Sequence, residues 1–70
     1  MPIVVAPMGV DLKIVKILTD KKTKKHLENL GLTINSTINI ISCSGSSVIC
    51  IVQNGRLAFD KDIATKIFVA

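Results

Sequence analysis

Apolar residues in this chain recur in short runs whose spacing predicts β-strands, and one stretch near the start has helical spacing instead. In DLKIVKIL (11–18), Leu12 and Ile14 alternate with Lys13, as in a strand that buries one face. Lys16 then arrives one position out of phase, and a β-bulge would restore the alternation. We therefore expect a first strand with a bulge near Lys16.

Three more apolar runs follow, with short links between them. The expected strands are TINIISC (37–43), SVICIVQ (47–53) and GRLAF (55–59). The link SGSS (44–47) has the size of a hairpin loop, and Asn54–Gly55 is the strongest two-residue hairpin signal in the chain. Links this short favour antiparallel pairing between successive strands.

The two ends of the chain complete the predicted fold. MPIVVAPMG (1–9) holds two prolines and a glycine, which predicts an irregular lead-in with a turn near residues 7–9. DKDIATKIFVA (60–70) predicts an acid-capped turn at Asp60–Ala64 and a last strand at Lys66–Val69. The whole chain (1–70) is then a single, mainly β domain, a small and partly open SH3-like five-stranded barrel with one short α-helix between strands 1 and 2.

The stretch DKKTKKHLENLGL (20–32) predicts that helix together with its ends. Asp20 can accept N–H bonds from the first turn, and Gly31 suits the left-handed position after the last turn. This places Leu27 and Leu32 at the positions that touch in a Schellman ending. The helix is expected to stop at Gly31 and to tuck its end into the core.

The helix is amphipathic, with Thr23, Leu27 and Leu30 on one side and the lysines centred almost opposite. These lysines are Lys21, Lys22, Lys24 and Lys25. We interpret them as a solvated face, which can steer the chain toward an acidic partner or an anionic membrane surface.

Length and composition restrict the class of protein. Seventy residues lie near the lower limit for a self-supporting core, with about 3–5 kcal/mol of net stability, so a weak homo-oligomer is left open. No apolar run approaches the roughly 20 residues that span a bilayer, and residues 1–9 do not have the pattern of a signal peptide. We expect a cytoplasmic protein that does not insert into the membrane.

The two cysteines, Cys43 and Cys50, are expected to remain reduced. If SGSS closes its hairpin symmetrically, Cys43 faces Val48 and Cys50 faces Ile41. The cysteines are then diagonal neighbours with Cβ atoms about 7 Å apart, whereas a disulfide needs about 4 Å. Both thiols are interpreted as small apolar strand residues.

A metal site, a nucleic-acid surface and an active site each find little support. His26 lies at the flank of the helix, and the chain has no C-x-x-C, H-x-x-x-H or acidic loop, so we assign no metal and no cofactor. Tyrosine and tryptophan are absent and Glu28 interrupts the lysines, which argues against nucleic-acid binding. Asp60 and Asp62 resemble capping residues, with no nucleophile–base pair, so we expect no enzyme activity.

The run SVICIVQ is apolar at every position from Val48 to Val52, although successive strand side chains point to opposite faces. Either the helix or the N-terminal segment covers the outer face of this strand, or that face is a docking surface for another chain.

The order of these motifs resembles the ferrous iron transport protein A family (FeoA). The resemblance rests on HLENLGL, on the strand pair after it and on NGRLAFDKDIATKIFV, and it runs from about Pro7 to the C-terminus. The matching positions are Leu27, Leu30, Gly31, Leu32, Gly55, Arg56, Leu57, Ala58, Ala64 and Ile67. Family members commonly have a Pro-Gly turn after the helix, where this chain has TINS (33–36), and Asn35 can supply that turn. SGSS is also shorter than the loop of many members.

The resemblance implies a bacterial cytoplasmic accessory protein that contacts the FeoB-type membrane ferrous iron transporter and performs no catalysis. We expect Leu27, Leu30, Gly31 and Leu32 to form the partner-binding wall beside the helix. If Leu27 is instead purely core, replacing it should unfold the protein. The alternative is a freestanding SH3-like interaction or nucleic-acid-binding module unrelated to iron, such as the C-terminal module of iron-dependent repressors.

Overall fold

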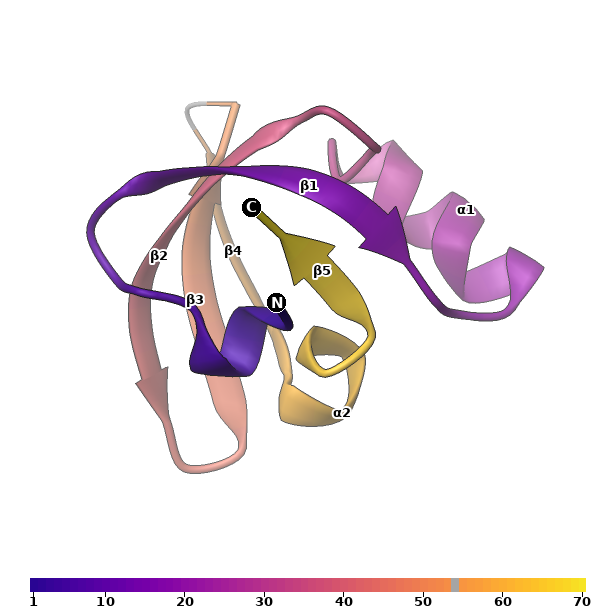
Figure 1. Cartoon of the computed structure of the whole chain (residues 1–70). Helices are drawn as coiled ribbons and strands as arrows, with labels where there is room; N and C mark the ends of the chain where they lie inside the picture. Colours follow the sequence, from indigo (N-terminus) through magenta and orange to yellow (C-terminus); the bar gives the residue numbers. More distant parts are fainter. Residues whose placement is uncertain (54) are drawn as a thin grey trace.

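The computed structural model describes residues 1–53 and 55–70, and it consists of one curved antiparallel sheet with two helices beside it (Figure 1). In the sheet the strands run in the order β4-β3-β2-β1-β5. Its elements are the 3-10 helix η1 (Ile3–Val5), β1 (Asp11–Ile17), α1 (Lys21–Asn29), β2 (Thr37–Ser44), β3 (Ser47–Val52), β4 (Gly55–Asp60), α2 (Lys61–Ala64) and β5 (Ile67–Val69). The predicted fold class is confirmed, a mainly β, SH3-like fold of five strands with a short helix between the first two.

The core lies on the concave side of the sheet. In each strand the apolar residues of the alternating pattern point toward this side. In β1 the inward residues Leu12, Ile14 and Ile17 are buried, and the register shifts between Ile14 and Lys16. The predicted bulge is therefore present, and it returns Ile17 to the inner face. The other buried core residues are Ile3, Leu27, Leu32, Ile38, Ile40, Val48, Cys50, Val52, Ala64, Ile67 and Val69.

The hairpin of β2 and β3 matches the predicted register near its turn and departs from it farther away. Cys43 pairs with Val48 as expected, but Cys50 pairs with Ile40 and not with Ile41. The register shifts between Ile40 and Ser42, so Ile41 leaves the alternation and is 40% exposed. Both cysteines are free thiols.

The Asn54–Gly55 hairpin prediction falls partly outside the described residues, because it includes residue 54. On either side of that position, Val52 pairs with Gly55, and β3 and β4 pair along their whole lengths.

The N-terminal segment is more ordered than the irregular lead-in that its prolines suggested. Met1 donates its N-terminal N–H to the carbonyl of Val69 at 3.0 Å and accepts the Val69 N–H at 2.8 Å. Pro2 forms a bridge with Phe68, and Ile3 is 1% exposed. These contacts cover the outer edge of β5. The buried side chain of Ile3 holds the segment in place, and Pro2 is tolerated there because a proline can lie at the edge of a sheet.

The end of α1 has the predicted Schellman geometry. Leu32 donates its backbone N–H to the carbonyl of Leu27 at 2.9 Å, and Gly31 donates to Glu28 at 3.0 Å. Gly31 has φ +92°, and Asn35 takes the left-handed turn after it at φ 74°. At the other end Asp20 has extended N-cap angles, and no capping hydrogen bond of standard geometry reaches its carboxylate. The hydroxyl and backbone N–H of Thr23 nevertheless hold the pKa of that carboxyl below its usual value, so the predicted cap is present only as a weak contact.

The two thiols should differ sharply in reactivity. Cys50 is 0% exposed and burial raises its pKa to about 11, whereas Cys43 is half-buried near the hairpin end. A disulfide reagent at neutral pH should therefore label one thiol in the folded chain and two in urea, because only the accessible thiolate reacts. Mass spectrometry of the labelled peptides checks the assignment, with Cys43→Ser as the control that should abolish labelling of the folded chain.

Candidate functional site

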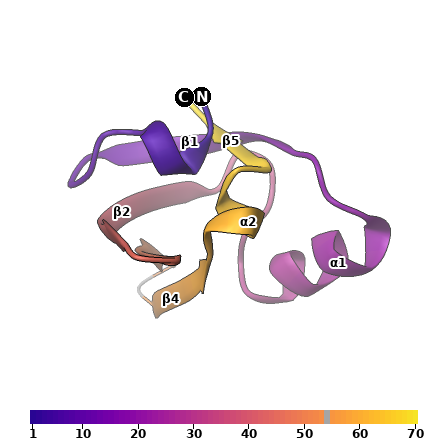
Figure 2. The ribbon, with the colours of Figure 1, turned by 90° about the horizontal axis from the view of Figure 1, so that it is seen from below.

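Strand β4 is the least covered strand of the sheet. Its inward residues Leu57 and Phe59 are only half-buried, while the inward residues of the other strands are nearly all buried. It pairs with β3 on one side, and no described residue hydrogen-bonds its backbone on the other. β4 therefore presents an unpaired edge next to an incompletely covered inner face. Figure 2 shows the backbone of β4 from below.

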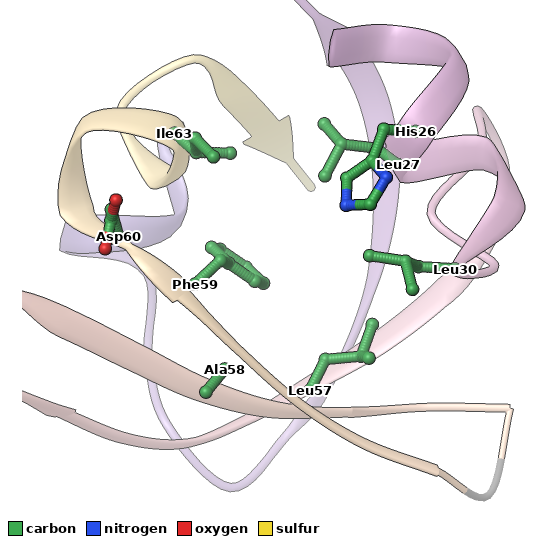
Figure 3. Close-up of a pocket in the computed structure, with 8 residues that line it drawn as sticks. All are labelled: His26, Leu27, Leu30, Leu57, Ala58, Phe59, Asp60 and Ile63. Carbon is green, nitrogen blue, oxygen red and sulfur yellow. The ribbon is translucent and has the colours of Figure 1, made fainter.

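A groove of about 250 Å³ lies between this strand and the first helix (Figure 3). From α1 and its C-cap come His26, Leu27 and Leu30, and Leu30 faces Leu57 across the hollow. Its lining residues are His26, Leu27, Leu30, Leu57, Ala58, Phe59, Asp60 and Ile63. The groove is mainly apolar, with the imidazole of His26 and the carboxylate of Asp60 as its polar members.

The four residues expected at a partner-binding wall occupy different environments. Leu27 is 2% exposed and Leu32 is 0% exposed, so both belong to the core and can only support a contact surface. Leu30 is 42% exposed and lies in the groove, where a partner could reach it. Gly31 is half-buried, and a Cβ there would meet Oε1 of Gln53 at 3.0 Å. Binding by these residues stays a prediction, and Leu30 is the member able to make the contact.

Sequence reasoning did not single out the opposite wall. The alternation in GRLAF predicts that Leu57 and Phe59 lie on the same face of β4. Ile63 lies in the segment predicted as a turn, which forms the short helix α2 in the structure. The alternation predicts that these side chains point inward, but it does not predict that they remain partly exposed to solvent. That depends on where α1 stops relative to β4, which is a long-range feature.

The candidate ligands for a metal do not converge. Among residues 1–53 and 55–70, no group of three histidine, cysteine or acidic side chains lies close enough to hold a metal ion. His26 is exposed and turns into the apolar groove, while Cys50 is buried within the sheet. Asp60 is the N-cap of α2, yet its carboxylate makes no capping hydrogen bond, contrary to the capping role expected for it.

The lysines of α1 are solvated, as their spacing predicted. Lys21, Lys22 and Lys25 are exposed and Lys24 is half-buried. None of the helices in the described residues has the length and apolar character to cross a bilayer.

The outer face of β3 remains partly open. Ile51 is 41% exposed, and the bulged Ile41 on the neighbouring strand is 40% exposed. The expectation that the helix or the N-terminal segment covers this face is not met at Ile51. Neither isoleucine lines the groove, so this exposed apolar area is separate from it.

Comparison with known proteins places the fold. A crystal structure of an iron uptake regulatory protein (FeoA) matches 99% of this chain and 93% of its own, with a TM-score of 0.88 and 26% identity. Iron(II) transport protein A from Clostridium thermocellum matches with a TM-score of 0.89 and 21% identity, and this chain covers 44% of that one. The FeoA protein from Chlorobium tepidum gives a TM-score of 0.89 at 15% identity over 68% of its chain.

Among curated proteins, none matches the sequence. The model of the FeoA domain, by contrast, matches residues 1–70, the whole length of the chain. With an SH3-like barrel of matching topology and a family match over its full length, this chain belongs to the FeoA family, and that membership supports a role in ferrous iron transport.

Proposed function

We propose that this chain is a cytoplasmic accessory protein of bacterial ferrous iron uptake that acts by direct contact with the cytoplasmic region of a FeoB-type membrane transporter. The groove between α1 and β4 carries the proposal, because it leaves Leu30, Leu57 and Phe59 open to a partner. Family membership supplies the iron-transport context. In this proposal the chain acts through binding and not through catalysis.

The physical case for a protein ligand is the character of the groove. Its walls are aliphatic and aromatic, and its few polar groups are too sparse to bind a small charged molecule. An open apolar hollow that a partner's side chain can fill is typical of a binding hot spot. The exposed lysines on the other side of α1 would act at longer range, raising the association rate with an acidic partner and making that rate fall with added salt.

Leu30→Gln should weaken binding to the transporter's cytoplasmic region about tenfold or more while leaving the chain folded, because Leu30 is exposed on the groove wall. Ile51→Gln is a matched control, since Ile51 is 41% exposed against 42% for Leu30 but lies on the outer face of β3. Titration calorimetry with purified components measures both affinities. Equal affinities for the wild type and Leu30→Gln would show that the partner does not bind in the groove. A loss of affinity confined to Ile51→Gln would show that it binds the outer face of β3.

A further inference from the structure

We propose that the occupant of the groove is an extended, acidic segment of the transporter's cytoplasmic region, which adds to the sheet as a further strand along the free edge of β4. This inference rests on the proposed function and specifies how the partner is held. It depends on three observations: one edge of the sheet is covered and the other is free, the inner face of β4 is incompletely covered, and the chain has a net positive charge.

The two edges of the sheet are not equivalent. At β5 the first residues of the chain cover the edge, through the Met1–Val69 pair and the Pro2–Phe68 bridge. At β4 the described residues leave the edge without any backbone partner. Proteins usually block such an edge, since a row of free N–H and C=O groups is a template for another strand.

The backbone groups on that edge can be assigned by alternation. Val52 and Gly55 flank the two residues that join β3 to β4, and the pair that closes a two-residue link is hydrogen-bonded. Alternation along the antiparallel pair then turns the N–H and C=O groups of Arg56, Ala58 and Asp60 away from β3. These three residues supply the donors and acceptors for an added strand.

The side chains make this edge suitable for a strand with one apolar face. An added strand would lie between β4 and α1, with alternate side chains pointing into the hollow lined by Leu30, Leu57 and Phe59. It would bury the inner residues that the fold leaves half-open. Backbone bonds would then supply affinity and the apolar hollow would supply specificity.

The positive charge of α1 and of the whole chain favours an acidic segment, although no lysine is among the described residues that line the groove. Helix α1 carries four lysines against the single acid Glu28, and the whole chain has a net charge of +4. Among the described residues Asp60 is the one carboxylate that lines the groove, so the acidic residues of the partner are expected toward α1 and not toward α2.

Amide hydrogen exchange of the labelled chain, free and saturated with the transporter's cytoplasmic region, tests the backbone pairing. The amides of Arg56, Ala58 and Asp60 should exchange at least about tenfold more slowly in the complex, while those of Leu57 and Phe59 are already protected by β3. Unchanged exchange at all three outward amides in a saturated complex would overturn the added strand and leave the proposed function standing.

A proline at position 58 tests the same pairing through affinity. Ala58→Pro removes one outward N–H and should weaken binding about tenfold, because a proline is tolerated where the N–H faces away from the neighbouring strand. Ala58→Val is the matched comparison, since it keeps the N–H and favours a strand, and it should bind more tightly than Ala58→Pro. Full affinity of a folded Ala58→Pro chain would overturn the inference, and if that variant does not fold, the exchange measurement decides. Absence of any binding by the wild type would remove the proposed function and the added strand together.

Discussion

Leu27→Ala is expected to leave the chain largely unfolded at room temperature. Leu27 is 2% exposed, and removing a buried leucine side chain costs about 2–5 kcal/mol. A domain of this length has only about 3–5 kcal/mol of net stability. The substitution therefore removes most or all of the free energy of unfolding.

Far-UV circular dichroism during urea titration measures this effect, because the chain has no tryptophan or tyrosine to follow by fluorescence. Leu30→Ala is the control on the same helix side and should change the free energy of unfolding by less than about 1 kcal/mol, since Leu30 is 42% exposed. If both variants unfolded at the same urea concentration as the wild type, Leu27 would not be a core residue.

Gly31→Ala is expected to lower the free energy of unfolding by about 1–3 kcal/mol. A side chain in the left-handed region costs about 1–2 kcal/mol, and φ at Gly31 is +92°. The new Cβ would also lie 3.0 Å from Oε1 and 3.1 Å from Cδ of Gln53, and 3.4 Å from Cγ1 of Val52. Gln53 is exposed and can move, so backbone strain should be the larger part of the loss.

Two variants separate these contributions in the same urea titration. Gly9→Ala has a comparable φ of +78° with nothing within 4 Å of the new Cβ, so it reports strain alone. Placing Gly31→Ala in a Gln53→Ala background removes the crowding and should return part of the loss. A Gly31→Ala chain as stable as the wild type would show that the end of α1 adjusts without cost.

Structural features that depend on neighbouring residues could be predicted from the sequence. The spacing of LENLGL gave the helix end, since a glycine after the last turn and leucines on both sides of it specify a Schellman ending. Lys16 marked the bulge in β1 because it broke a simple alternation. These features depend on residues close together in the chain.

The features that escaped prediction depend on distant contacts. Leu27 and Leu30 share a helix side and both line the groove, yet one is buried and the other is 42% exposed, and helical spacing cannot distinguish them. Ile41 is as apolar as Ile40, and only the shifted pairing with β3 places it outside. The burial of Ile3 required knowing that the first residues lie against β5, more than sixty positions away.

The pairing of Met1 with Val69 has a consequence for folding. It joins residues 68 positions apart, and β5, which completes the sheet beside β1, is synthesised after the other described strands. Closing so long a loop costs only slightly more entropy than closing a shorter one, but contacts between distant residues slow the search for the native pairing. Until residues 67–69 emerge, β1 has only β2 beside it, and the nascent chain has a second free strand edge that the finished sheet does not have.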